Sequence, residues 1–345
     1  MKKRLGFFSI CMLLLMTVLA GCGNTSKTEG TEGKKSEEKK EYVIKFAHVV
    51  SASTAKGKAA DKFKELLEEK TNGQIKVEVY PDSQLGADQE ITEQMQAGTI
   101  QMNAPFTGVL PSFVKQFEVF DLPFLFKDRE HVRKAVNGKL GDIFNEQLEK
   151  QGLRAIGYWD GGFKHLTNSK HTIKKPEDLN GLKMRVSQSP LLISQFKAMG
   201  AGGVSIDFAE LYTALQTKTV DGQENPLSNI VSKKFYEVQD YLTLSAHGYM
   251  AYPVIISEKF YQDLPADLQK AVTEVAAEVS DWQWEQAAAD EEKYMQTLKD
   301  SGIEITELSD SEKEAFVKAT SKVYDEFKKS VDGGQELLDA IKDAE

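Results

Sequence analysis

One basic side chain and one amide stand at positions where they could hold a carboxylate. Arg185 lies within an alternating segment, residues 182–186, which predicts a strand bounded by Gly181 and by a Ser/Pro turn. A guanidinium makes two parallel charge-assisted hydrogen bonds to a carboxylate, and an amide can hold the same group from another side. Asn225 can supply that amide. The sequence therefore predicts a small-anion site that includes Arg185 and Asn225.

The stretch from Phe208 to Pro226 combines a helical pattern with a polar ending. Leu211, Tyr212 and Leu215 fall at helical spacing and can bury one face. The sequence DGQENP at 221–226 cannot continue that helix, and no core packing would require it. We therefore expect a polar turn that forms part of a ligand cleft.

The chain carries no motif of a known reactive site. It has no Gly-x-Ser-x-Gly elbow, no His-Glu-x-x-His and no phosphate loop, and the five histidines show no metal-ligand spacing. We expect a binding protein that is not an enzyme and needs no cofactor or metal. Catalytic groups can also converge from distant segments, so an unusual enzyme stays open as the rival class, and a turnover assay separates the two.

The first residues predict export and anchoring. Residues 1–21 begin with Lys-Lys-Arg, continue with an apolar run and end in Leu-Ala-Gly before Cys22, which is typical of a lipoprotein signal peptide. An ordinary signal peptide with an incidental Cys is the alternative. Residues 22–41 would be the lipidated Cys22 and a flexible tether, because their composition cannot form a core. This places the protein outside the cytoplasm, anchored to the cell membrane.

Length and charge narrow the remaining possibilities. About 300 residues follow the tether, enough for two domains. A net charge of -10 argues against nucleic acid as a partner, whose binding surfaces are basic. Strand and helix patterns alternate, beginning with strand 42–47, helix 56–70 and strand 75–80, which indicates an α/β fold. A helical pattern from 265 to about 298 exceeds ordinary helix length.

Several motifs resemble, in order and spacing, the solute-binding proteins of TRAP (tripartite ATP-independent periplasmic) transporters. They are KMRV at 183–186, FAELYTALQ, VDGQENP and KKFYEVQDYLTL. The resemblance implies a two-lobed periplasmic-binding-protein-like fold with a hinge and a long helix across both lobes. Lobe 1 would be 42–160 plus 251–290, and lobe 2 would be 161–250 plus 291–345. It also implies a small carboxylate ligand and two membrane subunits as partners, although a sensor could replace the permease.

The same resemblance assigns site residues. Arg185 and Asn225 match the carboxylate-binding pair of the family. Lys164 stands in GFKHLTN where many relatives have Arg, and the branch that binds C4-dicarboxylates is similar in having Lys there and in KFAHVVSASTAKGKAADKF, GYWDGGFK and HGYMAYPVI. We therefore expect malate, succinate or fumarate as ligand. Lys56, ahead of the first helix, is the candidate for the second carboxylate, or else a solvated lysine.

Four further residues complete the expected site. His48 follows the first strand, Phe106 and Thr107 follow the turn at Pro105, and Phe208 opens the FAELY helix. His48 could donate to a ligand oxygen or merely cap the turn, and Phe208 could pack on the ligand or belong to the core. The resemblance implies that Phe106 and Thr107 line the cleft from the first lobe. Ser187 departs from the Pro that often follows the Arg-Val pair, which leaves selectivity near it open. Another carboxylate, such as a monocarboxylate, a 2-oxo acid or a sugar acid, is the alternative ligand.

Overall fold

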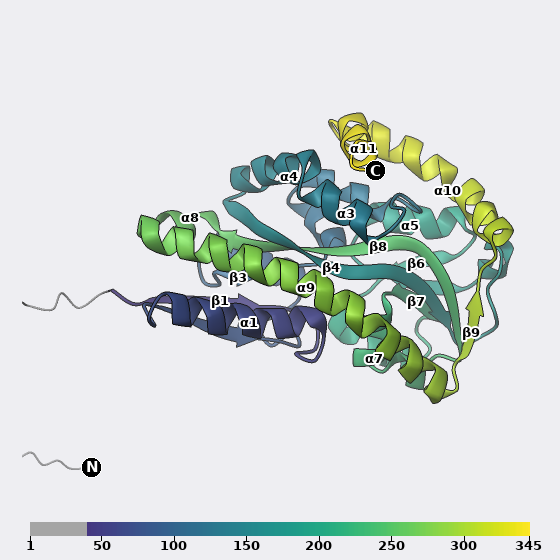
Figure 1. Cartoon of the computed structure of the whole chain (residues 1–345). Coiled ribbons are helices and arrows are strands. Elements are labelled where there is room, and N and C mark those ends of the chain that lie inside the picture. Colours follow the sequence, from purple (N-terminus) through teal and green to yellow (C-terminus); the bar gives the residue numbers. More distant parts are fainter. Residues whose placement is uncertain (1–39) are drawn as a thin grey trace, which may run out of the picture. The chain divides into compact units, whose positions relative to one another are not determined.

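The computed structural model describes residues 40–345 (Figure 1). The predicted signal peptide, Cys22 and nearly all of the tether lie outside the described residues, so the expected lipidation stays a prediction. Within residues 40–345, no helix is both long and apolar enough to cross a bilayer.

Within residues 40–345, nine strands form a single mixed sheet in the order β2-β1-β3-β8-β4-β7-β5-β6, with β9 paired to β8. The strands are β1 Tyr42–Ala47, β2 Ile75–Tyr80, β3 Met102–Asn103, β4 Leu153–Asn168, β5 Lys183–Val186, β6 Gly202–Ser205, β7 Gly222–Asn225, β8 Tyr241–Ser257 and β9 Glu304–Glu307. The α-helices are α1 Ala55–Lys70, α2 Asp88–Gln96, α3 Arg129–Val136, α4 Lys139–Lys150, α5 Pro190–Ala198, α6 Leu211–Gln216, α7 Leu227–Ser232, α8 Glu258–Gln262, α9 Ala266–Ser301, α10 Asp310–Ser330 and α11 Gly334–Lys342. This is the expected α/β class.

Two sets of parallel strands flank the long antiparallel pair β4 and β8. β1 pairs in parallel with β2 and β3, and β5 pairs in parallel with β6 and β7. β3 pairs with the later half of β8, and β7 pairs with the later half of β4, both antiparallel. This register directs the carboxyl ends of both sets toward the middle of the β4–β8 ladder. Ligands of open α/β sheets bind at such carboxyl ends.

The structure corrects the expected strand lengths at the middle of the sheet. The sequence predicts strands that stop at Tyr158 and Ala246, just before expected crossings between the lobes near Asp160–Gly162 and His247–Tyr249. The strands instead continue through both segments as β4 and β8, which pair along most of their lengths. Gly162 adopts φ +97°, and the pairing register shifts between Asp160 and Gly162. A bulge with a glycine therefore lets β4 continue past its predicted end.

The long C-terminal helix is confirmed. α9 has 36 residues and ends at Ser301, and the next residue, Gly302, caps it with a left-handed φ of +83°. It lies along the sheet beside α1 and contacts β4 and α7 as well (Figure 1). Its apolar face joins β1, β2 and α1 in one buried cluster that includes Phe46, Phe63 and Val272.

Most short elements match their sequence patterns, with two differences. The opening β1-α1-β2 unit is found as predicted. The helical pattern at 129–151 is divided at Asn137 and Gly138 into α3 and α4. The expected polar turn at DGQENP is wrong, because residues Gly222–Asn225 form β7, which is buried between β4 and β5. Gln223 donates to Thr167 of β4, and Glu224 accepts from Lys164 of β4, contacts that the local sequence does not reveal.

Candidate functional site

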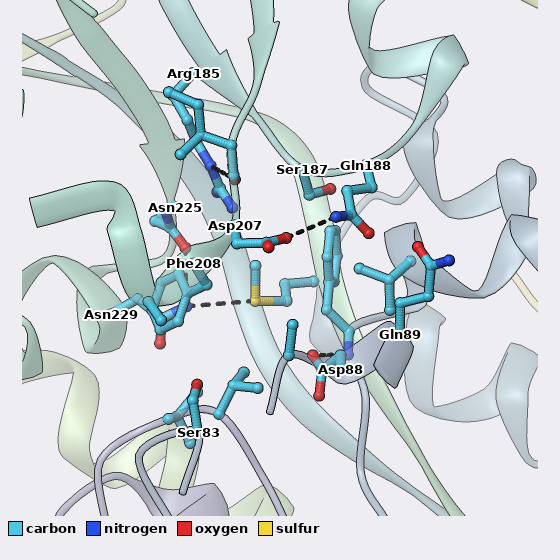
Figure 2. Close-up of a pocket in the computed structure, with 18 of the residues that line it drawn as sticks. Ser83, Asp88, Gln89, Arg185, Ser187, Gln188, Asp207, Phe208, Asn225 and Asn229 are labelled. Atoms are coloured by element: carbon cyan, nitrogen blue, oxygen red, sulfur yellow. Dashed lines mark hydrogen bonds between the residues drawn. The ribbon is translucent and has the colours of Figure 1, made fainter. Parts of the chain in front are cut away.

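A cavity lies at the carboxyl ends of the two sets of parallel strands. It contains about 660 Å3 of atom-free space and is partly open to solvent. Segments after β1, β2 and β3 line one side, and segments from β5, β6 and β7 line the other. Figure 2 shows Ser83, Asp88 and Gln89 opposite Arg185 and Asn225. Residues from distant parts of the sequence therefore face one space.

Arg185 lines this cavity at the end of β5 and is only 5% exposed. Its Nε donates to the carbonyl oxygen of Ile206 at 2.7 Å, which holds the guanidinium in place. Among residues 40–345, no carboxylate oxygen lies within ion-pair distance of it. Burial lowers the pKa of Arg185 to about 10, against the opposing effects of Glu224 and Asp207, so the group is charged at neutral pH. An ordered buried cation without an ion-pair partner is suited to an anionic ligand.

Asn225 lines the same cavity at the end of β7 and is held by two further amides. Its Oδ1 accepts from Nδ2 of Asn229 at 2.8 Å, and its Nδ2 donates to Oε1 of Gln223. Asn229, on α7, also lines the cavity. These bonds order the Asn225 amide beside the cavity that Arg185 lines, so the structure brings the two predicted residues together.

Lys164 differs from these two residues, because a protein carboxylate neutralises it. Its Nζ donates to Oε1 of Glu224 at 2.8 Å, and both side chains are almost fully buried. Nε2 of His247 lies 2.8 Å from the other oxygen of Glu224, and Ser245 lies 2.7 Å from Nδ1. An ionised carboxylate only accepts hydrogen bonds, so Nε2 carries the proton. Lys164 does not line the cavity, whereas Glu224 does.

Glu224 is ionised in this network. Burial by itself would raise its pKa, but the charge of Lys164 and the hydrogen bond from His247 outweigh burial and hold the pKa at about 2. The pKa of His247 is lowered, mainly by burial, so a neutral imidazole is favoured. The network therefore contains a compensated ion pair and a neutral histidine.

Lys56 lies beside the cavity without lining it. Its buried Nζ donates to the carbonyl oxygen of Ala104 and lies 4.0 Å from the centre of the Tyr252 ring. Burial lowers the pKa of Lys56 to about 8, with Asp88 opposing. Lys56 lines an adjoining cavity of about 430 Å3, which shares Tyr252 and Asn229 with the first. It is therefore not a solvated lysine, the alternative that the sequence leaves open.

Of the four remaining candidate site residues, two line the cavity and two do not. Phe106 and Phe208 line the cavity, and the Phe208 ring packs edge-on against Phe235 with centroids 6.1 Å apart. His48 and Thr107 are fully buried and do not line it. Both ring nitrogens of His48 and the Thr107 hydroxyl lack hydrogen-bond partners among residues 40–345. Burial, reinforced by Lys56 and Lys233, lowers the pKa of His48 to about 3.

Sequence reasoning misses several polar residues of the cavity. Asp207 lines it after β6 and accepts from Nε2 of Gln188 at 2.6 Å (Figure 2). Ser83 and Asp88 line the opposite side, and Oδ2 of Asp88 accepts from the backbone N–H of Phe106. All follow predicted strands within a few residues, and position after a parallel strand is the signal that could have identified them.

Comparisons with known proteins show which family this chain resembles along nearly all of the described residues. A model of bacterial extracellular solute-binding proteins, family 7, matches residues 46–330. The C4-dicarboxylate-binding periplasmic protein DctP of Rhodobacter capsulatus is 42% identical over 304 residues, covering 88% of this chain and 90% of that protein.

Two solved structures extend the likeness to the fold. A TRAP periplasmic solute-binding protein of Sulfurospirillum deleyianum with bound succinate is 41% identical, with a TM-score of 0.84 over 89% of this chain and 100% of that one. The sugar acid binding protein DctPAm of Advenella mimigardefordensis, in complex with galactonate, is 34% identical, with a TM-score of 0.86 over 89% and 99%.

Family membership follows from the length of these matches. TRAP solute-binding proteins share a two-lobed α/β fold, bind small carboxylates outside the cytoplasm and work with membrane permease subunits. The chain belongs to family 7 of the bacterial extracellular solute-binding proteins, the solute-binding proteins of TRAP transporters.

Proposed function

We propose that this protein captures a C4-dicarboxylate, such as malate, succinate or fumarate, and delivers it to the small and large membrane subunits of a TRAP transporter. The observation that carries the proposal is the buried guanidinium of Arg185, which lines a cavity and has no ion-pair partner among residues 40–345. A ligand carboxylate would supply the missing anion, and the ordered Asn225 amide would hold the same carboxylate.

The second ligand carboxylate would be stabilised by Lys56. Its ammonium lies next to Tyr252, a residue common to the ligand cavity and the adjoining cavity. The N-terminal end of α1 adds favourable backbone dipoles near the same position. The C4-dicarboxylate relative and the succinate-bound structure support this ligand class. Lys164 would act indirectly, by keeping Glu224 ionised and fixed beneath the cavity.

Ligand capture would close two lobes, residues 42–160 plus 251–290 and residues 161–250 plus 291–345. The cavity is lined from both sets of strands, so one ligand can contact both lobes. Contact with both is what makes a ligand favour a closed form over an open one. A smaller scattering radius with succinate than without it is the expected result, and an unchanged radius would contradict closure.

Attachment through a lipid on Cys22 would keep the binding domain beside its membrane partners. Cys22→Ser is expected to release the protein from the cell-membrane fraction without changing ligand affinity. Retention of the variant in that fraction would favour anchoring by an uncleaved signal peptide. The binding measurements below do not depend on this part of the proposal.

Calorimetry with the purified domain, residues 40–345, tests the ligand class. We expect a C4 diacid to bind with a Kd on the order of micromolar, which corresponds to about -8 kcal/mol. The ligand should also raise the melting temperature, because it binds the folded state alone. No binding of succinate, malate or fumarate, together with tight binding of a monocarboxylate, would refute the ligand class.

A sugar acid is the second candidate, and one observation favours it. Among residues 40–345 that line the cavity, Arg185 is the single cationic residue, whereas Ser83, Gln89, Asp207 and Asn229 offer polar groups for hydroxyls. The galactonate complex of a relative supports this reading. Galactonate should therefore be included in the same titration series, and tighter binding of galactonate than of every C4 diacid would select this candidate.

A further inference from the structure

Ser187 is a polar residue of the ligand cavity whose hydroxyl has no assigned role. It follows β5 directly and lines the same cavity as Arg185, two residues earlier. Residues two apart on an extended chain point to the same side. Figure 2 shows Ser187 among the residues at the Arg185 side of the cavity. The Ser187 hydroxyl is therefore available close to the end of the ligand that Arg185 holds.

The Ser187 hydroxyl is buried and, among residues 40–345, has no hydrogen-bond partner. Its two neighbours are committed to other groups. Gln188 donates to Asp207, and Ser189 donates to Asp121 at 2.6 Å while it caps the N-terminus of α5. An unpaired buried hydroxyl is unfavourable, whereas a ligand oxygen within reach would satisfy it. A serine hydroxyl turns about a single bond, so it can follow such an oxygen.

The place of Ser187 two residues after Arg185 indicates which part of the ligand its hydroxyl can reach. If Arg185 and Asn225 hold a carboxylate, the nearest other ligand atom is carbon 2, which is bonded to that carboxylate. We propose that the Ser187 hydroxyl hydrogen-bonds to an oxygen substituent on carbon 2, so that the site favours 2-hydroxy and 2-oxo acids over unsubstituted ones. This inference rests on the proposed function and narrows its substrate class to diacids of the malate type.

Calorimetric titration of wild type and Ser187→Ala with L-malate, D-malate and succinate tests the inference. We expect one malate enantiomer to bind wild type roughly fivefold more tightly than succinate, the effect of one neutral hydrogen bond. Ser187→Ala should weaken that enantiomer until it equals succinate, and should leave succinate affinity unchanged. Its melting temperature should equal or exceed that of wild type, because the variant loses a buried hydroxyl that has no partner among residues 40–345.

Ser232→Ala is the matched control. The Ser232 hydroxyl is also buried without a partner among the described residues, but Ser232, on α7, does not line the cavity. This variant should keep the malate-to-succinate ratio of wild type. The inference is overturned if wild type shows no malate preference, if Ser187→Ala keeps the preference, or if Ser232→Ala abolishes it equally.

A second set of ligands tests the Ser187 contact independently of the proposed C4-dicarboxylate class. If wild type binds no C4 diacid, the proposed function fails, and L- and D-lactate against propionate then test Ser187 alone. A lactate preference that Ser187→Ala removes would support the contact with carbon 2. The absence of such a preference, or its persistence in Ser187→Ala, would overturn it.

Discussion

Arg185 and Lys164 are two buried cations on strands that β7 separates, and their charges are compensated in different ways. Lys164, on β4, is paired with Glu224 at 2.8 Å, and that pair is supported by His247. Arg185, on β5, is held by a backbone carbonyl and has no carboxylate within ion-pair distance among residues 40–345. Only Arg185 lines the cavity. The difference separates a charge that the protein neutralises from a charge left for a ligand.

This comparison shows that burial by itself does not identify a ligand-binding residue. The two side chains have similar exposure, and both lie within motifs that indicate carboxylate binding. A buried charge must be compensated, and the source of that compensation is decisive. Where the protein supplies it, mutation should mainly reduce stability. Where a ligand supplies it, mutation should mainly reduce affinity. Four predictions test or refine this contrast.

The largest expected effect is on stability, at the compensated pair. Glu224→Ala should reduce the free energy of unfolding by about 4 kcal/mol, because it leaves Lys164 buried without its counter-ion. Urea unfolding of the purified domain measures this loss. The double variant Glu224→Gln, Lys164→Met should recover much of it, since both buried charges are then gone. An equally unstable double variant would contradict charge compensation as the cause.

The next effect is on affinity, at the uncompensated cation. Arg185→Ala should weaken binding of a C4 diacid by about 3 kcal/mol, because the ligand carboxylate loses its buried charged partner. The free energy of unfolding should change far less. Calorimetry and urea unfolding measure the two quantities on one preparation.

Arg133→Ala is the control for the loss of an arginine. Arg133 pairs with Asp281 near the surface and does not line the cavity. It should bind like wild type. Wild-type affinity in Arg185→Ala would show that the cavity assignment is wrong.

Buried histidines differ from both of these cations, because burial keeps their side chains neutral in the folded protein. Burial is the main cause that lowers the pKa values of His48 and His165 to about 3. An unfolded histidine titrates near pH 6.5, so this contribution to stability is complete above that pH and is lost as pH falls toward 3. The contribution of Asp121 to stability changes with pH in the opposite direction. Burial raises its pKa to about 7, and its contribution is lost as pH rises from 3.8 toward 7.

His48 by itself takes up about one proton on unfolding between pH 4 and pH 6, because its pKa is about 3 in the folded protein. It should therefore make stability rise with pH by about 1.4 kcal/mol per unit in this range. Urea unfolding at pH 4, 5 and 6 measures the slope. His48→Gln should lower the slope by about this amount, and an unchanged slope in that variant would remove His48 as a source.

The smallest expected effect is on ligand affinity, at the buried cation Lys56. Its ammonium is held by a carbonyl oxygen and an aromatic ring, without an ion-pair partner among residues 40–345. Lys56→Ala should weaken diacid binding by about 1 kcal/mol and leave monoacid binding nearly unchanged, because only a diacid has a second charge to stabilise. Titration with succinate and butyrate measures the ratio. An unchanged ratio would remove Lys56 from the ligand site.

The sequence by itself determined the local elements and the central residues of the proposed site. β1, α1 and β2 follow from short-range periodicity, as does α9. Arg185 and Asn225 were found because their side-chain chemistry and their motifs agree, and both line the cavity. These features depend on residues close together in the chain, where side-chain spacing determines which face is buried.

Only the tertiary structure decided which charges remain available to a ligand. DGQENP reads locally as a turn, yet its middle is a strand because β4 and β5 supply partners on both sides. Lys164 reads as a ligand residue, yet Glu224, sixty positions later, pairs with it. The sequence leaves the role of Ser187 open, whereas the structure shows that its buried hydroxyl has no partner among residues 40–345. Strand pairing and charge compensation join distant segments, and local sequence patterns do not encode which segments meet.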